Sequence, residues 1–123
     1  MIYYDKKPSV IETEHNGRTR YRYHIERYEQ QDEQRGEVRE GWQCEEVIVY
    51  APLSSNKLLQ AVITDAYPAD YEQKLVNEYN SAVIGLYDEE TAARKIDAYK
   101  SFLQAREELK AMVEADCAEE GIR

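Results

Sequence analysis

Cysteine, glycine and histidine are all scarce in this sequence, and their scarcity argues against several kinds of site. The 123 residues include two cysteines, Cys44 and Cys117, which lie far apart and have no second cysteine at CxxC spacing. A disulfide-stapled scaffold is therefore not expected, and both thiols are predicted to be small buried apolar side chains. The five glycines form neither a GxGxxG nor a GxxxxGK[ST] pattern, so no nucleotide-binding loop is predicted.

Long apolar runs are missing as well. No stretch approaches the roughly 20 residues that a membrane-spanning helix needs, and the N-terminus lacks the basic, apolar and small-residue segments of a secretory signal. Hydrophobic residues make up 42% of the chain and charged residues 33%, which is typical of a soluble globular protein. These features predict a cytoplasmic protein with no membrane partner.

The net charge of the chain is −9. Proteins bind nucleic acid through clustered Lys and Arg, which release counterions from the phosphates, so no nucleic-acid partner is expected. A chain of 123 residues can bury a core of its own but is short for two ordinary domains. A single domain spanning residues 1–123 is therefore predicted.

The residue pattern changes at Pro52, and this change predicts an α+β fold. Before Pro52, segments rich in Tyr, Arg and Val alternate in polarity as β-strands do, whereas after it apolar residues recur at the spacing of amphipathic helices. Residues 1–52 are expected to form a small antiparallel β-meander of three or four strands. Residues 53–123 are expected to form three α-helices that pack on one face of this sheet.

A hairpin turn is predicted at residues 15–17, because the glycine at position 17 accepts a positive φ. A three-residue turn sets Glu12 opposite Arg20 and Glu14 opposite Arg18, whereas a two-residue turn would lose both charge pairs. The second strand then carries its Arg residues on one face and its Tyr residues on the other. We interpret the Arg face as a solvated row that is paired with glutamates.

Residues 28–41 are rich in Glu and Gln and have no period that would bury one face, so a mobile loop is expected there. Residues 42–50 end in a β-branched run and are expected to form the third strand. Residues 2–4 are a candidate fourth strand at an edge. A sheet this small needs a covering layer, which the helices would provide.

The three predicted helices have recognisable ends. Ser54 or Ser55 can cap the first, Pro68 separates the first from the second, Gly85 ends the second, and Asp88 caps the third. The apolar stripes are Leu58, Leu59, Val62, Ile63, Ala66 and Tyr67 in the first helix; Tyr71, Leu75, Val76, Tyr79, Ala82, Val83 and Leu86 in the second; and Ala92, Ile96, Tyr99, Phe102, Leu103, Leu109, Met112 and Val113 in the third.

The third helix is expected to be long, at about 30 residues or about 45 Å. The second helix, at about 17 residues, can cover only the first half of it. The second half must then pack on the first helix and the sheet, which we favour, or reach another chain. The candidate partner interface on this helix comprises Phe102, Leu109, Met112 and Val113, and a sheet edge is the alternative contact surface.

No catalytic, metal-binding or cofactor-binding residue is predicted. His15 lies at the expected turn and His24 in the following strand, at a spacing unlike that of zinc ligands. Acidic pairs such as those at 45–46 and 89–90 are adjacent in sequence rather than convergent, which is typical of helix starts and solvated faces. The sequence therefore favours a protein that is not an enzyme.

Residues 59–70 (LQAVITDAYPAD), residues 77–80 (NEYN) and the last helix, which is rich in Ala, Glu and Lys, carry a resemblance. Residues 42–117 resemble small uncharacterised prophage proteins that are encoded near tail-fibre genes in gut bacteria. The resemblance implies a virion-associated or assembly-accessory protein that works by binding other proteins. The family provides no catalytic residues to carry over.

These observations favour a non-enzymatic protein–protein interaction module, which binds another protein or a second copy of itself. Two alternatives stay open. An acidic mimic of nucleic acid is suggested by the net charge of −9, although Arg and Lys are interspersed along the last helix. A small-ligand-binding domain would need a pocket with convergent polar groups between the sheet and the helices, which no linear motif predicts.

Overall fold

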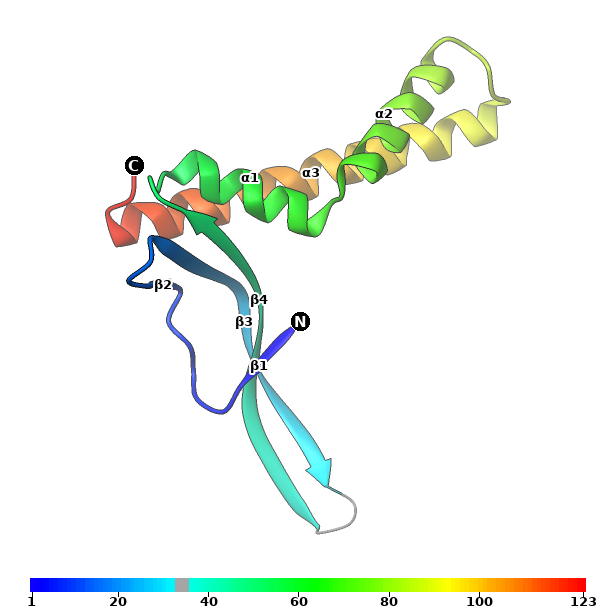
Figure 1. The fold of residues 1–123 in the computed structure, drawn as a ribbon. Helices are drawn as coiled ribbons and strands as arrows, with labels where there is room; N and C mark the ends of the chain where they lie inside the picture. The colour runs from blue at the N-terminus through cyan, green and yellow to red at the C-terminus, as the bar shows by residue number, and fades with distance from the viewer. Residues whose placement is uncertain (33–35) are drawn as a thin grey trace.

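The computed structural model describes residues 1–32 and 36–123, which form a four-stranded sheet and three helices (Figure 1). The strands run antiparallel in the order β1-β4-β3-β2, so β2, β3 and β4 form a meander and β1 is added at one edge. The predicted α+β fold is confirmed, including the fourth strand. The elements are β1 (Ile2–Tyr4), β2 (Ile11–Thr13), β3 (Arg18–Asp32), β4 (Glu37–Tyr50), α1 (Ser55–Ala66), α2 (Ala69–Val83) and α3 (Glu89–Glu120).

The predicted register of the first hairpin is also confirmed. Glu12 lies opposite Arg20 in the register of β2 and β3, although its carboxylate forms its ion pair with Arg22. Gly17 has a φ of 79°, which a glycine adopts without steric cost. Glu14 lies 3.2 Å from Arg18 and 2.7 Å from Arg20. Charge pairs across the strands thus accompany the register that the turn length sets.

The strands β3 and β4 are longer than predicted, and the mobile loop expected at residues 28–41 is wrong for the residues described. Tyr28 pairs with Gly41 and Gln31 with Val38, so the ladder continues through most of this segment. Residues 33–35 of the expected loop lie outside the described residues. A two-stranded ribbon satisfies its backbone hydrogen bonds between its own strands, so a polar composition does not prevent it.

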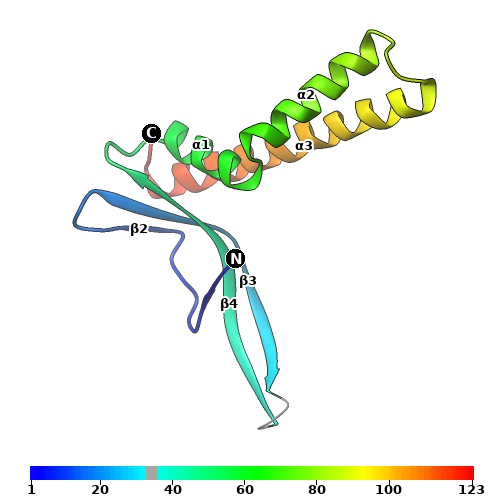
Figure 2. The same ribbon diagram turned by 45° about the vertical axis from the view of Figure 1, so that its right-hand side comes forward.

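The long ladder is interrupted by a bulge, where His24 and Ile25 oppose the single residue Cys44. His24 has a φ of 51°, in the left-handed region that few non-glycine residues adopt. A bulge bends a sheet and increases its twist. Beyond it, residues 26–32 of β3 and 37–43 of β4 extend away from the helices as the β ribbon (Figures 1 and 2).

The main core lies between the inner face of the sheet, α1 and the second half of α3. Alternation along β3 and β4 turns two tyrosines and two valines to this face, where they meet apolar side chains of both helices. Each buried valine or leucine side chain of this core contributes about 1.5–3 kcal/mol. The cluster comprises Tyr21, Tyr23, Val47, Val49, Leu58, Val62, Leu109, Val113 and Cys117.

The helix ends follow the predicted capping residues. The side chain of Ser54 accepts a hydrogen bond from the Lys57 amide, and that of Asp88 accepts one from the Thr91 amide. Gly121 closes α3 with a φ of 72°. These local signals therefore set the boundaries of α1 and α3 as expected.

Helix α2 lies against the first half of α3, and the two project from the body as a hairpin (Figures 1 and 2). We call α2 and residues 89–105 of α3 the helical arm. The expected division of α3 is confirmed, since α2 accompanies its first half and α1 with the sheet covers its second half. The arm and the β ribbon thus leave the body in different directions (Figure 1).

Candidate protein-interaction surface

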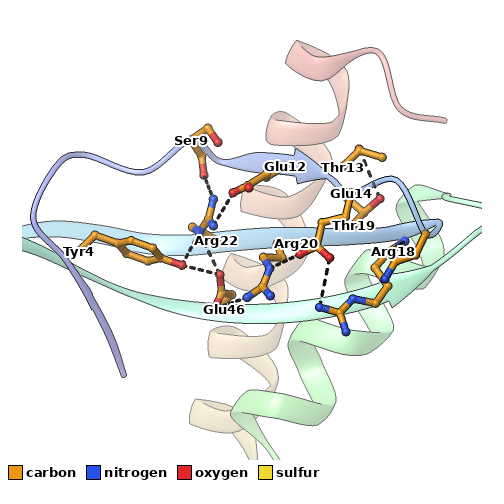
Figure 3. Close-up of polar contacts among 11 residues, drawn as sticks. Tyr4, Ser9, Glu12, Thr13, Glu14, Arg18, Thr19, Arg20, Arg22 and Glu46 are labelled. Atoms are coloured by element: carbon orange, nitrogen blue, oxygen red, sulfur yellow. Dashed lines mark hydrogen bonds and ion pairs between the residues drawn. The ribbon is translucent and has the colours of Figure 1, made fainter.

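The outer face of the sheet, which is turned away from the helices, carries a polar cluster around Arg22 (Figure 3). Arg22 is 4% exposed and donates hydrogen bonds to Glu12 at 2.7 Å, Glu46 at 3.0 Å and the Ser9 carbonyl at 3.1 Å. Tyr4 also accepts a bond from Arg22 and donates one to Glu46. The predicted pairing of this row with glutamates is confirmed, but Arg22 is buried rather than solvated.

The electrostatics of the cluster indicate a structural role. Burial acts to lower the pKa of Arg22, but the hydrogen bonds to Glu12 and Tyr4 outweigh it, so the pKa lies above its ordinary value. The guanidinium therefore stays charged and occupied by partners of the chain itself. It ties the segment between β1 and β2 to the sheet and presents no free group for a ligand.

Two tyrosine hydroxyls tie the inner face of the sheet to the helices. Tyr21 donates to Asp116 of α3, and Tyr23 donates to Asp65 of α1 at 2.6 Å. Burial raises the pKa of both phenols, and the hydrogen-bonded carboxylates raise it further. Both phenols are therefore neutral at ordinary pH and serve as donors between the layers.

The residues predicted as a partner interface lie mostly inside the protein. Phe102 is buried and packs edge to face on Tyr67, with ring centroids 5.0 Å apart. Leu109 and Val113 are buried in the main core, and Met112 is partly buried against it. The prediction is therefore corrected for Phe102, Leu109 and Val113, because the protein's own helices and sheet already cover them.

A hollow of about 420 Å³ lies where α1, α3 and the β3 bulge meet. Its lining is mainly apolar, and its imidazole and carboxylate side chains are those of His24 and Glu108, both of which are exposed. A site for a small molecule usually has several polar groups converging inside an enclosed pocket. The lining residues are His24, Ala66, Tyr67, Ala105, Glu108, Leu109 and Met112.

The helical arm has an apolar side that the rest of the described chain does not cover fully. Tyr79 of α2 stacks on Tyr99 of α3, with ring centroids 4.7 Å apart. At 3.6 residues per turn, a further apolar pair, with one residue from each helix, lies about one turn along the arm in either direction from this pair. We call the six residues of these three layers the arm face: Val83 with Ile96 near the tip, Tyr79 with Tyr99 in the middle, and Val76 with Leu103 near the body.

The arm face is accessible to solvent. Val83 is 60% exposed and Leu103 is 37% exposed, and the other four side chains are partly exposed. At the tip of the arm, Ile84 and Leu86 are exposed as well. Contiguous exposed apolar side chains on one surface mark a site of interaction more often than isolated ones do.

The opposite side of the arm is polar. Glu78 of α2 and Lys95 of α3 form an ion pair at 3.2 Å across it. The helical period places Lys74, Ser81 and Arg94 on the same side. The arm as a unit is therefore amphipathic, with one apolar and one charged side.

The sequence predicts inward apolar stripes in both helices and does not distinguish the arm-face residues within them. A helix that meets only one neighbour needs a narrow apolar stripe. The stripes of α2 and of the first half of α3 are wider, because a second row of apolar residues lies beside each of them as a flank. Val76 and Val83 form this flank on α2, and Ile96 and Leu103 form it on α3. The width of the stripes was the signal that marked this surface.

The described residues show no other arrangement with a clear chemical role. Across residues 1–32 and 36–123, no group of three or more His, Cys, Asp or Glu side chains is arranged to hold a metal ion. Cys44 and Cys117 are free and buried, and burial raises the pKa of both thiols. None of the helices described is both long and apolar enough to cross a bilayer.

A comparison of the chain with models of known protein families, with curated proteins and with solved structures found no match. The arm face, the hollow and the polar cluster are therefore interpreted from their own geometry.

Proposed function

We propose that this protein is a non-enzymatic protein–protein interaction module and that the arm face is its binding surface. The observation that carries the proposal is a row of apolar layers on one side of an arm that projects from the body, with Val83 60% exposed. Covering such a surface removes apolar area from water, which is favourable by about 25 cal/mol per Å². A complex in which a partner covers the arm face is therefore stabilised by the burial of this apolar area.

The composition of the arm face suits a protein partner. Two stacked tyrosines lie at its centre and branched aliphatic side chains lie around them. Aromatic residues are enriched, and charged residues depleted, at the cores of protein interfaces. The face also spans two helices, whereas a small molecule is usually held in an enclosed pocket.

The resemblance of residues 42–117 to small prophage proteins supports a finer proposal. According to this finer proposal, the chain assists phage tail assembly by binding a structural protein. It does so in the cytoplasm or attached to the virion. Neighbouring tail genes in the source genome are the expected finding. A location among unrelated metabolic genes would count against this finer proposal and leave the interaction module in place.

The hollow at the β3 bulge supports the alternative of a small-ligand-binding domain less well. Its imidazole and carboxylate groups come from His24 and Glu108, and both of these side chains are exposed to solvent. The alternative of a nucleic-acid mimic requires a surface of regularly spaced carboxylates. Lys74, Arg94 and Lys95 interrupt such a surface on the polar side of the arm.

A photoreactive amino acid tests the proposed surface in cells that produce the protein. Val83→p-benzoylphenylalanine, on the arm face, is expected to form discrete protein adducts on irradiation. Arg94→p-benzoylphenylalanine, on the polar side of the same arm, is the matched control and is expected to form few. Adducts of equal yield from both positions, or none from either, would contradict the proposal.

A further inference from the structure

We propose that the partner of the arm face is the arm face of a second copy of this chain, and that the two helical arms pack antiparallel into a four-helix bundle. The inference rests on the proposed function and names its partner. A two-helix hairpin with one apolar side is half of such a bundle, and a second hairpin completes the core. The same patch then serves both copies, as in most twofold dimers.

The arm face points away from the sheet. Asp116 accepts a hydrogen bond from Tyr21, so it marks the side of α3 that faces the strands. At 3.6 residues per turn, Leu103 and Ile96 lie about 140–160° round the helix from Asp116. A second copy can therefore reach the arm face without meeting the sheet of the first.

The three layers of the arm face match one another when two arms pack antiparallel. A twofold axis beside Tyr99 brings the central tyrosine layer of one copy onto that of the other. Because the outer layers lie at similar distances from the centre, Ile96 then meets Leu103 of the other copy, and Val76 meets Val83. Every apolar layer thus covers an apolar layer.

The charges at the two ends of the arm favour the antiparallel arrangement over a parallel one. Asp88, Glu89 and Glu90 begin α3 at the tip, whereas Lys110 lies on the same flank of α3 towards the body. Glu89 and Lys110 each lie about 16 Å along the helix from the twofold axis, so one meets the other across the dimer. Parallel arms would instead bring the acidic tips of both copies together.

The size of the face predicts a weak dimer. The part of α3 that carries the arm face, residues 92–105, extends over about 20 Å at 1.5 Å per residue, and two helices packed side by side are about 20 Å wide. The contact would bury about 400–500 Å² on each copy, or about 800–1,000 Å² in all, at the lower limit of specific interfaces. Dissociation in the micromolar range is therefore expected.

Sedimentation equilibrium of the purified full chain tests the dimer. Between about 1 μM and about 1 mM, a range that spans the expected dissociation constant, the average mass should rise from 14.4 kDa towards twice this value. Val83→Glu places a carboxylate against the other copy and is expected to weaken association at least tenfold. Ala98→Glu adds the same charge on the polar side of α3 and is expected to leave association unchanged.

Several outcomes would overturn the proposal. They are a wild-type chain that stays monomeric over the whole range, or an equal loss of association in Val83→Glu and Ala98→Glu. Circular dichroism checks the fold of each variant, and Leu103→Lys replaces Val83→Glu if that variant does not fold. Adducts of position 83 with a different protein, together with a monomeric purified chain, would overturn the second-copy assignment and leave the proposed function standing.

Thiol cross-linking tests the orientation of the arms. The native Cys44 and Cys117 are buried, so an added exposed cysteine is the reactive one. Antiparallel arms place the two copies of residue 100 beside the axis, and the two copies of residue 89 about 32 Å apart. A short bismaleimide is expected to join Lys100→Cys chains and not Glu89→Cys chains. The reverse pattern would overturn the antiparallel bundle.

Discussion

Replacing Arg22 by methionine is expected to destabilise the protein by about 2–3 kcal/mol, because it leaves a buried carboxylate without its main partner. The side chains of Arg22 and Glu46 are 5% and 9% exposed and lie 3.0 Å apart. Breaking a buried ion pair from one side typically costs about 3–5 kcal/mol. The loss is smaller here because Glu46 keeps the Tyr4 hydroxyl at 2.7 Å and Arg20 at 3.5 Å.

The same reasoning predicts that a second substitution restores most of the stability. Glu46→Leu in the Arg22→Met background removes the unpaired carboxylate and fills its place with apolar atoms. The double variant is expected to lie within about 1 kcal/mol of the native protein, since apolar replacements of buried ion pairs are often neutral. The single variants and the double variant together form a double-mutant cycle that isolates the coupling of the pair.

Urea unfolding followed by circular dichroism at pH 7 measures these differences as shifts of the midpoint at a constant m-value. Arg27→Met is the matched control, because Arg27 pairs with Glu40 at 3.0 Å while both side chains are more than half exposed. It is expected to cost less than about 1 kcal/mol. A loss in Arg22→Met no larger than in Arg27→Met, or a double variant less stable than Arg22→Met, would refute the reasoning.

Two further predictions concern the sheet. Because Tyr21 and Tyr23 have folded-state pKa values above the ordinary 10.0, their contribution to stability is complete below pH 10 and is lost as the pH rises beyond it, by up to about 1.4 kcal/mol per pH unit each. Alkaline unfolding curves should show this slope, and the slope should be shallower in the Tyr21→Phe/Tyr23→Phe variant, where the Tyr4 phenol and the two buried thiols still have raised pKa values. Gly41→Ala places a Cβ 2.6 Å from the Tyr28 ring and 3.1 Å from the Tyr4 carbonyl, so a loss of about 1–3 kcal/mol is expected in urea. The loss should shrink in a Tyr28→Val background, and an unchanged loss there would contradict the steric explanation.

The first hairpin and the helix ends could be predicted because local chemistry decides them. Gly17 permits the turn conformation, and the charge pairs of Glu12 and Glu14 select its length. The side chain of Asp88 accepts a hydrogen bond from the Thr91 amide at the start of α3, so no acceptor from a distant part of the chain is needed there. Signals of this kind act within a few residues and can be read in sequence.

The β ribbon could not be predicted from the same patterns. Its strands pair through backbone groups, which are identical in every residue except proline, and the sequence of residues 28–41 has no period that would bury one face. The bulge at His24 further shifts the alternation that identifies a strand. The periodicity of side chains therefore carries little information about this part of the sheet.

In the candidate site, helix α3 shows most clearly which features the local sequence decides and which it does not. By itself, the sequence determined that this helix is long and capped at Asp88. It did not determine which apolar side chains of the first half stay exposed, because apolar side chains attract one another without direction and both halves carry them. Only the tertiary structure decided this: the sheet and α1 bury Leu109 and Val113, whereas the first half packs mainly on α2, which leaves Leu103 exposed. The partners that bury a stripe come from distant parts of the chain, so the free surface is set by how the elements assemble.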